Sequence, residues 1–219
     1  MKLESNSKLL FIGDSITDAS RGSSGELSAW EPNFGLGQGY VSQVHAWLQA
    51  AHPAANIRVV NKGISGHTVR DLAVRWQADV IDQKPDVLCI MIGINDVWRQ
   101  FDSPLRPEIS VEPNEYRATL EKLLLLTKMD GSSIHMATPF FIEPNRTDAM
   151  RARMDEYGSI VRELALKNAA HFIDTQAAFD EVLAHMHPAA LAWDRIHPGP
   201  AGHMIIARAF LKSFGCLPS

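Results

Sequence analysis

A serine near the start of the chain and an aspartate–histidine pair near its end could together carry out nucleophilic chemistry. Ser15 directly follows an apolar run and the dipeptide Gly-Asp, while Asp194 and His197 lie in one predicted loop. A serine hydroxyl is a weak nucleophile at neutral pH, so it needs a base such as a neutral imidazole. That imidazole in turn needs a carboxylate to fix its tautomer. These three residues therefore form a candidate catalytic triad.

Hydrogen-bond donors for a developing oxyanion are also present in the sequence. Two further apolar runs end in glycine, one at Gly63 and one just before Asn95. The backbone N–H groups of Ser15 and Gly63 and the side-chain amide of Asn95 are the candidate donors. Because imidazole ordinarily titrates near pH 6.5, we expect activity to rise through about pH 6–7.

Each of these residues also has a structural interpretation. Ser15 could cap a helix, His197 could be an ordinary loop histidine, and Asn95 could stabilise a turn. Asp194, His197 and His203 could instead hold a metal ion, although no larger ligand cluster is visible. We favour the triad and predict neither a metal site nor a cofactor.

The elements that must position these residues alternate between apolar runs and amphipathic stripes. The runs predict five strands, at 9–12, 57–60, 87–92, 133–137 and 171–174. Helical stripes separate them, so we predict an α/β fold, a three-layer α/β/α sandwich with a parallel sheet of about five strands. In the flavodoxin-like order 2-1-3-4-5, the first three strands are neighbours. Ser15, Gly63 and Asn95 would then meet in one crevice.

The segment 18–39 is too long for a plain connection between a strand and a helix. It contains five glycines together with Trp30 and Phe34. We predict a functional loop, because its aromatic residues indicate packing; a disordered insert is the alternative. Asp14, just before the candidate nucleophile, is expected to fix that turn.

Length and composition restrict the class of protein. The 219 residues suit one domain, 1–219. The net charge of -4, with no basic run, argues against nucleic acid or an anionic membrane as partner. No segment approaches the length of a membrane span, and the first residues lack the apolar core of a signal peptide. We therefore expect a cytoplasmic protein. Cys89, within an apolar run, is expected to be a buried free thiol.

Four motifs of the chain, taken in order, resemble those of the SGNH (GDSL-type) hydrolases. They are Gly13-Asp14-Ser15, the block around Gly63, Gly93-Ile94-Asn95-Asp96 and Asp194-Arg195-Ile196-His197. Each motif alone is weak, but all four occur at predicted strand ends or in a late loop. The resemblance implies Ser15 as nucleophile, His197 as base and Asp194 as its partner. It places Gly63 and Asn95 in the oxyanion hole and implies no cofactor.

Longer segments, at 59–66, 92–100 and 192–195, are similar to the bacterial intracellular acetylxylan esterases of this superfamily. This resemblance implies removal of O-acetyl groups from acetylated xylo-oligosaccharides and small acetyl esters. It also implies a homo-oligomer, in which the loop 18–39 could close the site against a neighbour. Trp98 and Trp193 are candidate substrate-binding residues. His67 departs from the asparagine that the pattern leads us to expect.

Two other functions fit parts of the pattern. A lysophospholipase or thioesterase acting on longer acyl chains would use the same triad, but it would need a longer apolar channel. A flavodoxin-like binding module would hold an anion or a flavin at the first strand end without catalysis.

Overall fold

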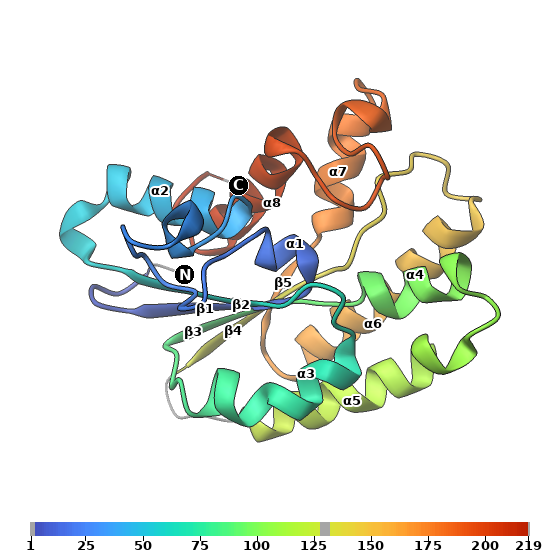
Figure 1. Ribbon diagram of the computed structural model, residues 1–219, viewed down its shortest axis with the longest axis horizontal. Coiled ribbons are helices and arrows are strands. Elements are labelled where there is room, and N and C mark those ends of the chain that lie inside the picture. Colours follow the sequence, from blue (N-terminus) through green and yellow to red (C-terminus); the bar gives the residue numbers. More distant parts are fainter. Residues whose placement is uncertain (1–2, 128–131, 219) are drawn as a thin grey trace.

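A parallel five-stranded sheet forms the centre of the computed structural model, which describes residues 3–127 and 132–218 (Figure 1). The strand order is β2-β1-β3-β4-β5, which confirms the predicted order. The strands are β1 (Lys8–Gly13), β2 (Arg58–Gly63), β3 (Val87–Met91), β4 (Ser133–Ala137) and β5 (His171–Ile173).

Helices cover both faces of this sheet, which confirms the three-layer architecture (Figure 1). They are α1 (Ser15–Asp18), α2 (Tyr40–Ala51), α3 (Val69–Trp76), α4 (Ile94–Asp102), α5 (Pro113–Leu126), α6 (Ala149–Lys167), α7 (Thr175–Leu183) and α8 (Pro200–Ser213). One layer contains α2, α8 and α7, and the other contains α3, α5 and α6. No helix within the described ranges combines the length and the apolar character needed to cross a bilayer.

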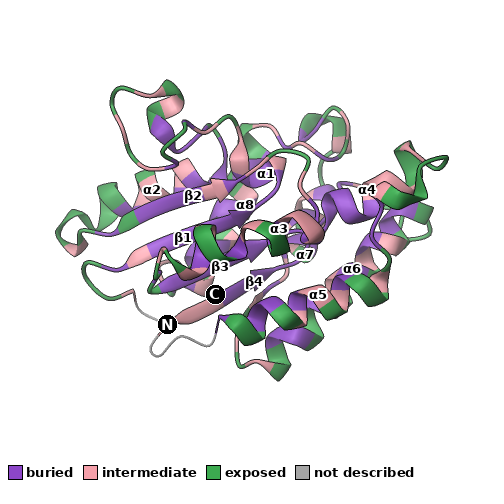
Figure 2. Cartoon of the chain, turned by 60° about the horizontal axis from the view of Figure 1, so that its bottom comes forward, coloured by how far each residue is buried: buried purple, intermediate pink, exposed green. Residues whose placement is uncertain are grey.

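The neighbouring strands β1 and β3 are buried on both faces, so their apolar runs need not alternate. Residues 9–12 of β1 are fully inaccessible, as is Cys89 in β3, a free thiol. Beneath α2 and α8, the ring of Phe11 packs edge-on against Tyr40 at 5.7 Å and Phe210 at 5.3 Å between ring centroids. Figure 2 shows this buried centre, with exposed residues on the outward faces of the helices.

The loop 18–39 packs along the free edge of β2. The N–H of Asn61 donates to the Gly25 carbonyl at 2.6 Å, and Glu26 pairs with Arg58. Contrary to our expectation, the aromatic residues of this loop do not pack against the protein, since Trp30 is 96% exposed. Leu36, at 2% exposed, supplies the apolar contact instead.

Helix α4 is an element that the strand pattern did not predict. After β3 the chain turns at Gly93, whose φ is 133°, and the helix begins at the next residue. Asn95 and Asp96 therefore lie in the first turn of a helix rather than in a loop. Their side chains are therefore held by a helix, α4, at the carboxyl edge of the sheet.

The buried carboxyl of Asp96 ties α4 to α3. Its Oδ1 accepts the N–H of Val69 at 3.0 Å, while Oδ2 is buried and has no partner among the described residues. Burial, the largest influence, raises the pKa of Asp96 to about 7 from an ordinary 3.8. The folded protein therefore retains a proton that the unfolded chain releases at about pH 4.

We expect Asp96→Asn to remove one pH-dependent part of the free energy of unfolding. Because the folded pKa is raised, the stability supplied by Asp96 is present below about pH 4 and is lost as the pH rises toward 7. The stability of the variant relative to wild type should therefore grow by on the order of 3 kcal/mol between these values. Urea unfolding at a series of pH values measures this difference, in which other titrating groups cancel. A difference independent of pH would contradict the assignment.

Candidate active site

A cavity of about 410 Å³ lies where β1, β2 and β3 end. Its walls come from α1, the turn after β2, α4 and the loop before α8, lined by Ser15, Ile16, Ala19, Ser20, Ser65, Gly66, Asn95, Trp98, Arg99, His197, Pro198 and His203. Four residues predicted from the sequence line this cavity, namely Ser15, Asn95, Trp98 and His197.

Ser15, His197 and Asp194 form one continuous chain of hydrogen bonds. Ser15 Oγ lies 3.0 Å from His197 Nε2, and His197 Nδ1 lies 2.6 Å from Asp194 Oδ2. The other carboxylate oxygen, Oδ1, accepts the N–H groups of Ile196 at 3.0 Å and of His197 at 2.8 Å. With a proton on Nδ1 facing the carboxylate, Nε2 can accept the serine proton.

The loop keeps Asp194 ionised. Burial alone would raise the pKa of this carboxyl, but the hydrogen bonds from the His197 ring and from two backbone N–H groups outweigh it and lower the pKa below its ordinary value. Arg195, between the two, adopts φ 63°, which lets the chain fold back so that the histidine reaches its own carboxylate.

Asp14 fixes the turn that presents Ser15, as the sequence led us to expect. It is the N-cap of α1, and its Oδ1 accepts the N–H of Ile16 at 3.0 Å. Ser15 is the first residue of the helix, where N–H groups have no acceptor within the helix. The hydroxyl and the N–H of Ser15 therefore share one end of a short helix.

The structure does not bring Gly63 to the cavity, so our expectation for this residue was wrong. Gly63 ends β2 inside the sheet, and its N–H donates to Asn61 Oδ1 at 2.9 Å. Gly66 lines the cavity instead, with φ 82° and, among the described residues, no acceptor for its N–H. The second glycine of the segment Gly63-Ile64-Ser65-Gly66 was the available signal, because only it lies beyond the strand end.

The side-chain amide of Asn95 is oriented from both ends. Its Nδ2 donates to the carbonyl of His67 at 2.9 Å, and its Oδ1 accepts from Arg99 Nη2 at 3.3 Å. If the amide were flipped, its NH₂ group would face the guanidinium of Arg99, which is also a donor, and its oxygen would face the carbonyl of His67, which is also an acceptor. Nδ2 carries a second hydrogen, and Asn95 lines the cavity while being only 2% exposed.

The two candidate tryptophans lie in different places. The ring of Trp98 lies edge-on to His197 at 5.9 Å between centroids, and the guanidinium of Arg99 lies over it at 4.4 Å. Trp193 is 85% exposed and lines a separate hollow with His187 and Arg195. The structure thus brings Trp98, but not Trp193, into the cavity with Ser15.

His203 also faces the cavity, from α8. Its Nδ1 accepts the N–H of Tyr40 at 3.2 Å, and its ring stacks on that of Tyr40. Burial, followed by the proximity of His197, lowers the pKa of His203 to about 4. A neutral imidazole held in this way packs α8 against α2. The predicted absence of a metal remains a prediction.

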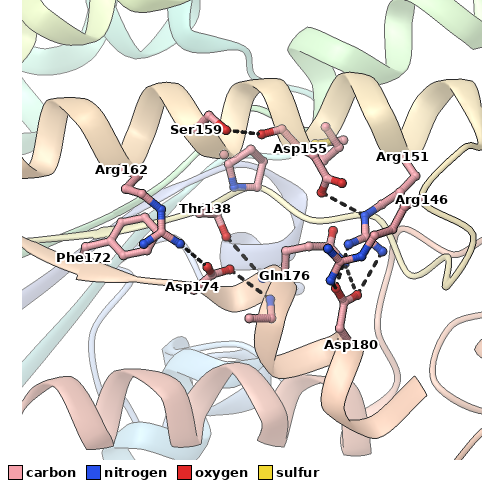
Figure 3. Close-up of a pocket in the computed structure, with 14 residues that line it drawn as sticks. Thr138, Arg146, Arg151, Asp155, Ser159, Arg162, Phe172, Asp174, Gln176 and Asp180 are labelled. Atoms are coloured by element: carbon pink, nitrogen blue, oxygen red, sulfur yellow. Dashed lines mark hydrogen bonds and ion pairs between the residues drawn. The ribbon is translucent and has the colours of Figure 1, made fainter. Parts of the chain in front are cut away.

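A second cavity, of about 280 Å³, lies beyond β4 and β5, between α6 and α7 (Figure 3). Its arginines are paired with aspartates, since Arg151 contacts Asp155 and Asp180, and Arg162 contacts Asp174. The hydroxyl of its one lining serine, Ser159, donates to a carbonyl of its own helix. Among the described residues, its lining contains no histidine that could serve as base. Nucleophilic chemistry is therefore better supported in the first cavity.

Comparisons with known proteins agree with this geometry. The model of the GDSL-like Lipase/Acylhydrolase family matches residues 11–205. An acetylxylan esterase of Geobacillus stearothermophilus is 57% identical over 216 residues, covering 98% of this chain and 97% of the relative.

Solved structures extend the similarity to the backbone. Axe2, an acetylxylan esterase from Geobacillus stearothermophilus, has a TM-score of 0.94 at 57% identity, covering 98% of this chain and 97% of its own. LAE5, an alpha/beta hydrolase from the metagenome of Lake Arreo, has a TM-score of 0.92 at 51% identity, covering 99% of each chain. Given a family match that spans most of the sequence and relatives this similar over their full length, the chain belongs to the GDSL-like lipase/acylhydrolase family.

Proposed function

We propose that this chain is a serine esterase that removes O-acetyl groups from acetylated xylo-oligosaccharides and small acetyl esters. The observation that carries the chemistry is the hydrogen-bonded series Ser15–His197–Asp194 at the wall of an open cavity. The acetylxylan esterase that is 57% identical over nearly the whole chain supports the substrate. We assign this activity to one domain covering residues 1–219.

In the proposed mechanism, Ser15 Oγ attacks the acetyl carbonyl while His197 Nε2 takes its proton. The proton passes to the departing sugar oxygen, leaving an acetyl-enzyme. Water then attacks this ester with His197 again as base, which releases acetate and restores the serine. Solved variants of Axe2 described as catalytic mutants, in which a serine, a histidine or an aspartate is replaced by alanine, support these three roles.

Three donors are proposed to stabilise the oxyanion in both steps. They are the N–H of Ser15 at the start of α1, the N–H of Gly66 and the second hydrogen on Asn95 Nδ2. All three belong to residues that line the cavity, and none of these hydrogens has an acceptor among the described residues. Removing one such donor typically costs about 2.7–4 kcal/mol in the transition state.

The cavity walls favour a small acyl group and a sugar alcohol. Ile16, Trp98 and Pro198 supply apolar surface to the cavity that Ser15 and His197 line. Aromatic faces also suit the apolar face of a sugar ring, and we assign Trp98 to the acetylated unit. Trp193, exposed outside the cavity, is proposed to contact sugar units further along the chain.

A cytoplasmic location and a homo-oligomeric assembly also belong to this proposal. The exposed aromatic residues of the loop 18–39, Trp30 at 96% and Phe34 at 67%, support the assembly because burying such side chains against another copy is favourable.

Replacing the nucleophile tests the mechanism directly. We expect Ser15→Ala to lower kcat for 4-nitrophenyl acetate at least about 10⁴-fold. Its melting temperature should stay within about 3 °C of wild type, because the hydrogen-bond partner of the hydroxyl is His197 at the cavity wall. Ser20→Ala is the matched control, since Ser20 lines the same cavity but is not part of the hydrogen-bonded series Ser15–His197–Asp194. Full turnover by Ser15→Ala would overturn the mechanism.

Asp194→Asn should leave the loop in place and remove the correct tautomer of the base. The asparagine keeps an oxygen for the N–H groups of Ile196 and His197, but its amide can present a hydrogen to Nδ1. We expect kcat to fall about 10⁴-fold, as in other triads of this geometry. Steady-state rates with unchanged near-UV circular dichroism check this, and an active variant would mean that another group orients His197.

A series of acyl chain lengths tests the substrate. We expect nitrophenyl esters to be hydrolysed more slowly from acetyl to butyryl to octanoyl, because each added methylene must find room among Ile16, Trp98 and Pro198. Peracetylated xylobiose should release acetate in the same assay. Faster turnover of octanoyl than of acetyl esters, or no acetate from xylobiose, would favour the lysophospholipase or thioesterase alternative.

A further inference from the structure

The turn 64–67 holds Gly66 between two anchored neighbours. On one side, Asp18 Oδ2 accepts the N–H of Ser65 at 3.2 Å and its hydroxyl at 2.6 Å. On the other side, the ring of His67 is bound by Arg75. On its Cα side Gly66 faces open space, since no described heavy atom outside its two chain neighbours lies within 4 Å of the position that a Cβ would occupy. The position of its N–H is therefore set by these two flanking anchors.

Arg75 joins three segments that meet beneath the site. From α3, its Nε donates to His67 Nδ1 at 3.1 Å, Nη1 to the carbonyl of Lys62 at 2.6 Å and Nη2 to that of Gly13 at 2.9 Å. Asp79 pairs with the guanidinium of Arg75 at 3.0 Å and balances its charge. The side chain of Arg75 is only 11% exposed. One guanidinium thus connects the turn before Ser15, the end of β2 and the turn that carries Gly66.

His67 passes this restraint to a second donor. Its carbonyl accepts the Nδ2 hydrogen of Asn95, so the backbone of His67 fixes the direction of the amide that faces the cavity. We propose that Arg75 is a positioning residue for the oxyanion donors Gly66 and Asn95, acting through the neutral ring of His67, and that protonation of this ring releases the restraint. This inference rests on the proposed esterase function of the same site.

The hydrogen bond requires one protonation state of His67. Because the guanidinium only donates, Nδ1 must keep its lone pair, and the ring proton must be on Nε2. A doubly protonated imidazole has no lone pair there and would place a second cation beside Arg75. Acid therefore replaces an attraction by a repulsion at this contact.

Several charged groups surround this contact. Burial is the largest influence on the His67 ring, and together with the charge of Arg75 it opposes the cationic form. Asp71 in α3 and Asp79 in the following turn favour the cationic form. The net effect lowers the pKa of His67 below 6.5.

Groups on other elements complete the charges around this guanidinium. Arg21, after α1, adds positive charge next to Arg75, and Lys62 in β2 pairs with Asp79. Asp14, in the turn after β1, lies within range of Arg75; like Asp96 in α4, it has a pKa raised by burial to about 7 and contributes little charge in weak acid.

The acid sensitivity is particular to histidine at this position. The asparagine expected there from the family pattern could accept the same hydrogen bond through its side-chain oxygen, but it does not titrate. His67→Asn therefore keeps an acceptor for Arg75 while removing the proton-dependent step.

The first experiment compares two arginines of the same helix. Arg75→Lys keeps the positive charge but loses the planar guanidinium, whose three N–H groups donate to His67, Lys62 and Gly13. Arg70→Lys is the control, because Arg70 pairs with Glu115 on the surface. For 4-nitrophenyl acetate we expect kcat to fall about 10- to 100-fold in Arg75→Lys, with KM changed less than about threefold, since the donors act mainly in the transition state. Arg70→Lys should match wild type. An Arg75→Lys enzyme with wild-type kcat would overturn the proposal.

The second experiment remains informative even if Arg75→Lys folds poorly. The logarithm of kcat/KM is measured against pH for wild type and His67→Asn, over the range in which circular dichroism shows both folded. In acid, wild type should fall with a slope of about 1 from the proton on the catalytic base and, as His67 is protonated, by a further drop of about 10- to 100-fold. His67→Asn, with its profile referred to its own plateau, should follow a slope of about 1 throughout and lack the further drop. Identical acid limbs in the two proteins would overturn the proposal.

Failure of this inference is distinguishable from failure of the proposed function. If Ser15→Ala retains full esterase activity, the site itself is wrongly assigned. If Ser15→Ala is inactive while Arg75→Lys and His67→Asn behave as wild type, the esterase assignment stands and only the positioning role is refuted.

Discussion

No side chain fits at Gly13, and the geometry of the site depends on that restriction. A Cβ there would lie 2.3 Å from the Met91 carbonyl oxygen and 2.3 Å from Thr17 Oγ1. The glycine lets β1 end against β3 and lets α1 begin almost at once, folded back over the strand end. Ser15 consequently stands at the carboxyl edge with its helix packed tightly below. Because Gly13 pairs in register with Gly63 and Met91, all three chain segments leave the sheet at the same level.

Polar side chains inside the protein hold the segments that leave these strand ends. Asn61 is fully buried; its Nδ2 donates to the carbonyls of Thr17 at 2.7 Å and Leu36 at 2.9 Å, while its Oδ1 receives the N–H of Gly63. One amide therefore joins β2, α1 and the loop 18–39. Burying such a group is costly unless its hydrogen bonds are made, so this arrangement tolerates few alternatives. The same bond explains why Gly63 is unavailable to a ligand.

Local pattern allowed the strands to be predicted, the flavodoxin-like fold suggested their order, and the chemistry of four short motifs pointed to the residues of the triad. Apolar runs followed by glycine define strand ends, and parallel strands bring those ends together whatever the side chains do later. Two expectations, for Gly63 and for the aromatic residues of the loop 18–39, failed for reasons that lie in tertiary contacts, and tertiary contacts also place Trp193 outside the cavity. Gly63 is expected at the cavity because the apolar run ends at Val60, whereas β2 extends through Gly63. Trp193 neighbours Asp194 in sequence, but the tight loop points it outward. Trp30 lies on the surface, because Leu36 supplies the apolar contact of its loop.

The charge distribution around the site follows from the burial of its acids. An oxyanion is stabilised by donors but opposed by any nearby carboxylate, and two acids lie next to those donors: Asp14 precedes Ser15, and Asp96 follows Asn95. Burial raises the pKa of each to about 7, so near neutral pH both carry less negative charge than an ordinary aspartate would. The acid that must remain ionised, Asp194, has its pKa lowered by hydrogen bonds and acts on the far side of His197. The fully ionised carboxylate, Asp194, thus lies behind the proposed base, while the two acids beside the proposed donors are only partly ionised near neutral pH.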